Sequence, residues 1–287
     1  MNLVSPSQVK AFLEKKGIHP NKTLGQNFLI DGNILKIIID AAELSEDDYI
    51  LEIGPGLGVL TQRLVASGAR VSAVEKDSAL CSCLQEILSA EDSLDICCGD
   101  MMDVGVRGYM EAGVNKMVSN LPYSVGTRIL LDLACDPQPP ELMVVTVQLE
   151  VAQRITAVPG GKDYGMLSAW TQLIYDVELV RTIKPTCFFP RPAIESGIVK
   201  LTRRDRAFES REMQEKFCAL TKQSFMHRRK QLAPILSRLM VDPEISADDA
   251  RDLLESLGAD PKARPENLSV EQWCSLTRKL EGSLVSE

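Results

Sequence analysis

The string Asn120-Leu121-Pro122-Tyr123 carries the most specific chemistry in this sequence. An amino group on an aromatic base is a poor nucleophile, because its lone pair is delocalised into the ring. The side-chain carbonyl of Asn120 and a backbone carbonyl can both accept hydrogen bonds from such a group and aim its lone pair at an electrophile. Pro122 fixes the turn and removes a competing backbone donor. Tyr123 offers a stacking surface that contributes about 1–3 kcal/mol per base. We therefore take these four residues as catalytic candidates for methyl transfer to adenine.

A glycine loop and two carboxylates precede this string at regular intervals. Gly54 and Gly56 lie in LEIGPGLGVLT, where glycines let the backbone turn sharply and approach a ligand closely. Glu75 follows Gly54 by 21 residues, at the position where a carboxylate accepts hydrogen bonds from ribose hydroxyls. Asp100 follows Glu75 by 25 residues and can accept from the exocyclic amino group of adenine. This spacing predicts one shared cleft.

Other interpretations of these residues remain open at this level. Val59 stands where the dinucleotide-binding fingerprint has its third glycine, which disfavours NAD. Glu75 could be an acidic helix cap, although the nearby Asp77 could fill that role instead. The string at 120–123 could be a proline turn with a buried tyrosine.

The elements that must position these residues alternate between strands and helices. Such alternation predicts a mainly parallel sheet covered on both faces, whose ligands bind at the carboxyl ends of its strands. The predicted strands span 49–53, 70–74, 94–98, 116–119, 142–148, 175–183 and 197–201, and the helices among them span 59–67, 78–88 and 127–134. Helices alone are predicted afterwards, over 209–226, 229–240, 247–257 and 270–280. We therefore expect a domain of residues 1–205 and a helical domain of residues 206–287.

The composition excludes several classes of protein. The chain has 287 residues, of which 45% are hydrophobic and 25% charged, as in ordinary globular proteins and unlike disordered or collagen-like chains. No apolar run is long enough for a membrane span or a secretory signal. The eight cysteines form no CxxC pair and only two histidines are present, so we expect no metal site. Reduced thiols and a cytoplasmic location fit this pattern.

Charge is distributed unevenly along the chain. The formal net charge is −8, yet residues 200–230 carry ten Lys or Arg and four Asp or Glu. Such a block is either a solvated helical face or a footprint for RNA phosphates. Arg228, Arg229 and Lys230 are consecutive near the start of a predicted helix, so they cannot all face a core. We therefore favour RNA contact for these three.

Several motifs in order resemble those of the ribosomal RNA adenine N6,N6-dimethyltransferases, in particular the bacterial small-subunit type called KsgA. They are LGQNFL (24–29), the glycine loop, Glu75, Gly99-Asp100, NLPY (120–123), FFPRPAIES (188–196), FMHRRKQL (225–232) and GADPKARPENLS (258–269). The resemblance implies a Rossmann-like sheet of seven strands with one antiparallel, followed by a small helical domain. It also implies S-adenosylmethionine as cofactor, without a metal. The implied reaction dimethylates two adjacent adenosines in the 3′-terminal hairpin loop of small-subunit (16S) rRNA, a step of ribosome biogenesis.

The resemblance also implies roles for individual residues. Glu75 would hold the cofactor's ribose, Asp100 its adenine amino group, and Asn120 both cofactor and target. Tyr123 and Phe188 would sandwich the flipped adenine, which costs least to expose in a hairpin loop. The remaining cofactor contacts would come from Gln26, Asn27, Leu29, Gly54 and Gly56.

Four functions compete on the sequence. The small-subunit enzyme is favoured over the related large-subunit rRNA methyltransferase of macrolide resistance by the tail at 258–269. A ribosome-assembly or transcription factor without catalysis is disfavoured by the intact Glu75, Asp100 and Asn120. A DNA adenine methyltransferase would more often carry a separate DNA-reading domain. We expect a monomer that binds the small ribosomal subunit or its assembly intermediate, and neither DNA nor a membrane.

Overall fold

The protein divides into two compact units in a computed structural model, which describes residues 3–21, 24–204, 208, 210–239 and 245–280. One unit comprises Met1–Ala152 with Asp176–Arg203, and the other comprises Gln153–Tyr175 with Arg204–Glu287. Residues 153–175 thus belong with the C-terminal helices, whereas the sequence interpretation assigned them to the first domain. The predicted boundary at 205 and 206 lies outside the described residues.

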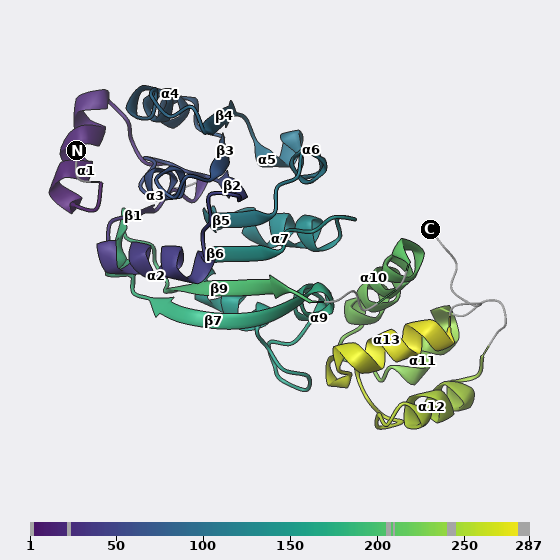
Figure 1. Cartoon of the computed structure of the whole chain (residues 1–287). Helices are drawn as coiled ribbons and strands as arrows, with labels where there is room; N and C mark the ends of the chain where they lie inside the picture. The colour runs from purple at the N-terminus through teal and green to yellow at the C-terminus, as the bar shows by residue number, and fades with distance from the viewer. Residues whose placement is uncertain (1–2, 22–23, 205–207, 209, 240–244, 281–287) are drawn as a thin grey trace. The chain divides into compact units, whose positions relative to one another are not determined.

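The first unit is built on a seven-stranded sheet of order β4-β3-β2-β5-β6-β9-β7 (Figure 1). The strands are β2 (Tyr49–Ile53), β3 (Arg70–Glu75), β4 (Leu94–Cys98), β5 (Lys116–Asn120), β6 (Leu142–Gln148), β7 (Tyr175–Ile183) and β9 (Ser196–Arg203). β2 to β6 pair in parallel, and β9 pairs antiparallel with β6. The predicted mostly parallel sheet is confirmed. The carboxyl ends of β2, β3 and β5 therefore meet at one edge.

Helices connect the strands and supply the core. They are α1 (Pro6–Lys16), α2 (Gly32–Ala42), α3 (Thr61–Val65), α4 (Ser78–Ile87), α5 (Met101–Val104), α6 (Arg107–Glu111), α7 (Gly126–Ala134) and α8 (Leu149–Ile155). Buried side chains of α2, such as Ile38, pack with Leu64 of α3 against apolar sheet residues such as Val118. The amphipathic spacing of α2 makes this possible, because its apolar residues recur along one face. No helix in the described part of the chain is long and apolar enough to cross a membrane.

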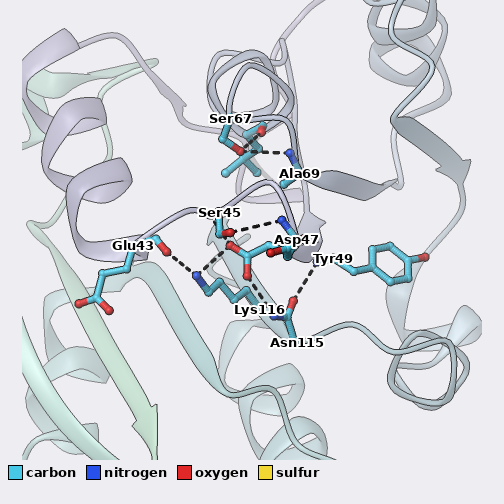
Figure 2. Close-up of polar contacts among 10 residues, drawn as sticks. Glu43, Ser45, Asp47, Tyr49, Ser67, Ala69, Asn115 and Lys116 are labelled. Atoms are coloured by element: carbon cyan, nitrogen blue, oxygen red, sulfur yellow. Dashed lines mark hydrogen bonds and ion pairs between the residues drawn. The ribbon is translucent and has the colours of Figure 1, made fainter.

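A polar cluster closes the amino-terminal ends of β2 and β5 (Figure 2). Asp48 is 5% exposed and accepts hydrogen bonds from Lys116 Nζ at 2.8 Å, Asn115 Nδ2 at 3.0 Å and the Ser45 amide at 2.7 Å. Lys116 also donates to the Glu43 carbonyl, and Asn115 Oδ1 accepts from the Tyr49 amide. Burial opposes ionisation of Asp48, but these hydrogen bonds hold its pKa below the usual value. The cluster therefore stabilises the sheet.

Two features of the first unit differ from the sequence interpretation. A second, two-stranded sheet pairs β1 (Phe28–Leu29) with β8 (Phe188–Phe189) antiparallel, next to a 3₁₀ turn over Pro185–Cys187. A disulfide joins Cys81 of α4 to Cys98 of β4, with a Cα–Cα distance of 5.8 Å. The expectation of reduced thiols is therefore wrong for this pair, whose separation of 17 residues matches no motif.

The second unit is helical. Its elements are α9 (Met166–Ile174), α10 (Arg211–Met226), α11 (Ala233–Leu239), α12 (Ala247–Ser256), a 3₁₀ turn (Pro265–Asn267) and α13 (Val270–Lys279). Trp170 of α9 donates a hydrogen bond to Thr221 of α10 at 2.9 Å, which ties α9 to the C-terminal helices. Trp273 and Phe217 lie fully buried in this unit. The helix predicted over 229–240 begins only at Ala233, because residues 227–232 lie outside any helix. The predicted ends at 209 and 240 lie outside the described residues.

Candidate active site

A cleft of about 310 Å³ lies at the carboxyl ends of β2, β3 and β5. All of its lining belongs to the first unit. The contributing segments are 24–29, 52–57, 74–76, 99–101 and 120–125, with Leu3, Val59, Leu60 and Leu80. The sheet thus brings together the motifs that the sequence spaces 20–25 residues apart, and the predicted shared cleft exists.

The glycine loop shapes the floor of the cleft. Gly54 adopts φ +70°, and a Cβ there would lie 3.0 Å from Pro122 Cγ. Gly56 adopts φ +59°, and a Cβ there would lie 3.0 Å from the ring of Phe28. Side chains at these positions would meet both backbone strain and a steric clash. The loop therefore packs directly under Pro122 and Phe28, with space only for a backbone.

Glu75 is fixed beneath this loop at the end of β3. It is 6% exposed, and its two oxygens accept hydrogen bonds from the Gly56 amide at 3.0 Å and the Asp77 amide at 2.8 Å. Burial raises the pKa of Glu75, and the two backbone donors oppose that shift. Asp77 caps α4 through the Ala79 and Leu80 amides. The helix-cap interpretation thus applies to Asp77, and it is wrong for Glu75.

Asp100 lies at the rim of the cleft with 21% of its side chain exposed. Its Oδ1 caps α5 by accepting from the Met102 amide at 3.0 Å, and its Oδ2 accepts from Lys76 Nζ at 2.5 Å. The hydrogen bond from Lys76 lowers the pKa of Asp100. A carboxylate has about four lone-pair sites, so two remain for a ligand donor.

Asn120 has one end of its amide fixed and the other unpartnered. Its Nδ2 donates to the Asn27 carbonyl at 3.0 Å, which sets the orientation of the amide. Its Oδ1 is buried and has no hydrogen-bond partner within the described residues. An unsatisfied buried acceptor costs about 1–3 kcal/mol, so it is usually explained by a ligand or by function. The carbonyl oxygen of Asn120 is therefore available to a donor that enters the cleft.

The neighbours of Asn120 hold the string in place. Leu121 is 1% exposed and its amide donates to the Thr146 carbonyl of β6, so its side chain anchors the string in the core. Tyr123 lines the cleft, and its hydroxyl shares a 2.5 Å hydrogen bond with Ser196 of β9. Burial raises the pKa of Tyr123, which keeps its phenol neutral.

Phe188 is not brought to this cleft, contrary to the expectation that it sandwiches adenine with Tyr123. It is 1% exposed and packs in the core with residues of α2 and the sheet, such as Ile38 and Val144. Successive side chains of a strand point to opposite faces, and the β1–β8 pairing turns Phe188 inward. The adjacent Phe189 is only half-buried and packs against the cluster that contains Phe28.

The segment 24–29 lines the cleft. Gln26 accepts from the Asn21 amide and donates to Asp77 at 2.8 Å. Asn27 Nδ2 donates to the Gly25 carbonyl at 3.1 Å, and the Asn27 carbonyl accepts from Asn120 Nδ2 at 3.0 Å. Leu29 is 3% exposed in β1. All three residues line the cleft.

Glu52 is a cleft residue that the sequence interpretation did not single out. It lies in β2, is 1% exposed, and its Oε2 has no hydrogen-bond partner in the part of the chain that the structure describes. Burial raises the pKa of Glu52 to about 8; the Thr61 side chain opposes this shift, and the nearby Glu75 adds to it. The available signal was a single carboxylate inside the buried strand YILEI.

The basic residues of the second unit are divided in their roles. Arg228 pairs with Glu266 at 2.6 Å and donates to the Lys162 carbonyl, so it joins the 158–162 loop to the 265–267 turn. Arg228 is therefore a structural residue and is not a free RNA contact. Arg229 and Lys230 are exposed. Three further exposed cations lie on the segments that meet here: Lys162, Lys262 and Arg264.

The fold and the cleft define the class of protein. A mostly parallel sheet with an antiparallel strand, a glycine loop after β2, an acidic residue at the end of β3, and NLPY after β5 are the features of a Rossmann-like methyltransferase. Within the described residues, no group of three His, Cys, Asp or Glu is placed to hold a metal ion.

Comparisons with known proteins give the family. The model of "Ribosomal RNA adenine dimethylase" matches residues 18–281. The chain is 36% identical to a Ribosomal RNA small subunit methyltransferase A of Natranaerobius thermophilus, covering 96% of each chain. It is 38% identical to the protein of that name from Chlamydia felis, covering 96% of this chain and 95% of the relative. The chain belongs to the ribosomal RNA adenine dimethylase family.

Solved structures support the fold. A dimethyladenosine transferase from Plasmodium falciparum aligns with a TM-score of 0.75 at 23% identity, covering 88% of this chain and 97% of that one. The 23S rRNA methyltransferase ErmE aligns with a TM-score of 0.67 at 25% identity, covering 89% of this chain and 100% of that one.

Proposed function

We propose that the protein transfers methyl groups from S-adenosylmethionine to the N6 amino groups of two adjacent adenosines in the 3′-terminal hairpin loop of 16S rRNA. The observation that carries this proposal is the amide of Asn120, whose nitrogen is held by Asn27 and whose buried oxygen has no partner among the described residues. That oxygen would accept a hydrogen bond from an incoming amino group.

The residues present fit the cofactor. Gly54 and Gly56 line the cleft without side chains, so a ligand can approach their backbone closely. Glu75 would accept from the ribose hydroxyls and Asp100 from the adenine amino group. Gln26, Asn27 and Leu29 would cover the methionine and adenosine side, and Gly54 and Gly56 its floor. When bound, S-adenosylmethionine supplies an electrophilic methyl group.

The protein's own residues then act by positioning. The Asn120 oxygen accepts from the target amino group and localises its lone pair, while Pro122 holds the string against Gly54. Tyr123 stacks on the flipped base. No strong base is needed, because an amino nitrogen that has gained a methyl group loses its proton readily. Burial of the cleft floor excludes water from the reaction.

We assign RNA contact to the exposed cations around the Arg228–Glu266 pair. Arg229 and Lys230 would bind phosphates together with Lys162, Lys262 and Arg264, because phosphate contacts are local and tolerate an acidic protein. The partner would be the small ribosomal subunit or its assembly intermediate. The protein would act on it as a monomer in the cytoplasm, where subunits are assembled.

The test is transfer of labelled methyl groups to small subunits that lack this modification. Large subunits, naked rRNA and duplex DNA would be assayed alongside, and the modified base would be mapped. We expect dimethyladenosine at two adjacent loop adenosines, on small subunits only. Label on large-subunit RNA would instead support the macrolide-resistance reaction, which the fold of ErmE makes the second candidate. Absence of label with the cofactor bound would contradict both.

A further inference from the structure

Two buried carboxylates line the cleft on the paired strands β2 and β3. Glu52 in β2 is 1% exposed, Glu75 at the end of β3 is 6% exposed, and the charge of Glu75 raises the cost of ionising Glu52. The oxygens of Glu75 are held by two backbone amides, whereas Glu52 Oε2 has no partner among the described residues. A negative charge is therefore costlier on Glu52 than on Glu75.

The charged groups around this pair do not neutralise Glu52. Lys76, which follows Glu75, is engaged by Asp100 at 2.5 Å. Asp77 accepts from the first amides of α4 and from Gln26. Arg63, on the same helix as Thr61, is exposed and lines a separate hollow with Asp40 and Glu43. β5 offers the neutral Ser119, which donates nothing to Glu52 and accepts from the Ile53 amide.

We propose that Glu52 is a proton-linked positioning residue for the cofactor: it is a neutral carboxylic acid in the empty protein and becomes a carboxylate when the cationic S-adenosylmethionine enters the cleft. This inference rests on the proposed function. The exchange is balanced, because the Glu52 proton passes to solvent as the positive charge enters. The cofactor's cation thus takes the place of the proton as the neutralising charge.

The pKa of Glu52, raised by burial to about 8, sets the size of this effect. At pH 7 the empty protein would then hold Glu52 about 90% protonated. A positive charge nearby in a poorly solvated site lowers a carboxyl pKa by about 1–3 units. Binding at pH 7 would therefore release about 0.4–0.9 proton. The affinity would rise with pH until Glu52 is ionised in the free protein.

The consequence for the catalytic cycle is selectivity by charge. Once the methyl group has left, the sulfonium charge is gone and Glu52 is less well neutralised. Glu52 then regains a proton from solvent, so that fresh and spent cofactor differ in affinity at this residue even though their shapes are nearly the same. A hydrogen-bonding site alone would discriminate much less between them.

The experiment is calorimetric titration at pH 7 in two buffers of different ionisation enthalpy, which counts the protons released on binding. Three ligands distinguish the effect of the sulfonium from that of the ammonium group. S-adenosylmethionine carries both, S-adenosylhomocysteine lacks the sulfonium, and 5′-methylthioadenosine lacks both. We expect release of about 0.4–0.9 proton with the first ligand, less with the second and none with the third. The variant E52Q should release none and bind S-adenosylmethionine about tenfold more weakly.

Controls keep the outcomes distinct. E91Q, a change at an exposed carboxylate outside the cleft lining, should behave like the wild type. Thermal denaturation at pH 6 checks folding of E52Q, because glutamine there mimics the neutral acid. The wild type alone supplies a second test, since its proton release should fall as pH rises through about 8. Equal release by wild type and E52Q, or release that does not fall with pH, overturns the role of Glu52 alone. Absence of binding by all three ligands overturns the proposed function with it.

Discussion

Buried polar groups at the two ends of the same parallel strands differ in whether they have hydrogen-bond partners. At the amino ends, Asp48, Asn115 and Lys116 bind one another and the nearby backbone, so that the polar atoms of their side chains are used (Figure 2). At the carboxyl ends, Asn120 Oδ1 and Glu52 Oε2 are buried without partners in the described structure. Satisfied polar groups stabilise a fold, whereas unsatisfied ones lower its stability and await a ligand. In this sheet the polar groups at the amino ends therefore stabilise the fold, and the unpartnered ones at the carboxyl ends are available to a ligand.

The largest expected effect is on stability, from the amino end. Lys116→Met leaves the buried Asp48 without its ion pair and should lower the free energy of unfolding by about 3 kcal/mol. Urea denaturation measures it. The control Lys36→Met removes an exposed pair with Asp40 and should cost less than about 0.5 kcal/mol. Equal effects of the two variants would show that the buried ion pair contributes no more to stability than an exposed one.

Asn120→Ala should have the converse profile. It removes the unpartnered acceptor, so methyl transfer to small subunits should fall by about 10²–10³-fold. The stability should change little, because the lost Nδ2 bond to Asn27 is offset by removal of an unsatisfied buried oxygen. Turnover near that of the wild type would exclude the assigned role.

Glu75→Gln should weaken cofactor binding more than it slows turnover at saturation. The variant keeps the size of the side chain but replaces one acceptor oxygen by an NH2 donor. One of the Gly56 and Asp77 amides then loses its acceptor, and hydrogen bonding to a ribose hydroxyl is weakened. We expect an affinity loss of about tenfold to a hundredfold by calorimetry, which corresponds to about 1.4–2.7 kcal/mol. An unchanged dissociation constant would remove Glu75 from the site.

The smallest effect in this series concerns the second unit. Changing Arg229 and Lys230 to Ala should weaken subunit binding about tenfold and lower the slope of log affinity against log salt by about 1.5. Arg228→Ala should instead lower the stability of the helical unit, since it leaves Glu266 unpaired. Lys10→Ala with Lys15→Ala is the charge-matched control in α1. If the wild type and the variant at Arg229 and Lys230 have the same salt slope, these cations are solvated surface residues and do not bind phosphates.

Stability at low pH gives a further test of the amino end. The pKa of Asp48 is held below its usual 3.8 in the folded protein. Its contribution is therefore fully present above about pH 4 and is lost as pH falls through the folded-state pKa. The acid sensitivity of Asp48→Asn should be smaller than that of the wild type in denaturation experiments near pH 3.

The sequence predicts the sheet and the cleft because both depend on local patterns. Strand-helix alternation gives the order of elements, and the glycine loop, Glu75, Asp100 and Asn120 follow from the rule that ligands bind at strand carboxyl ends. Long-range pairing was not predictable. β1 and β8 have two residues each, too few for any periodicity, and the inward turn of Phe188 depends on that pairing.

The sequence also does not predict which helices and side chains contact one another. The apolar face of α9 is visible in the sequence, but its packing against α10 and α13 is not. Likewise, three consecutive cations at 228–230 look equivalent as letters, and only Glu266, 38 positions later, distinguishes Arg228 from the other two. Glu52 belongs to no spaced motif, and only its burial in the strand YILEI distinguishes it from an ordinary surface carboxylate.

The pairing of β1 with β8 has a consequence for the order in which the protein matures during translation. Residues 28 and 29 leave the ribosome early, yet their strand partners, residues 188 and 189, are added only after two thirds of the chain. Until then the backbone that holds the amide of Asn120 has no sheet to join. A nascent chain can thus complete most of its parallel strands while the amide of Asn120 remains unaligned. Methyl transfer would therefore become possible only late in synthesis. A chain still being translated would not act on a neighbouring RNA.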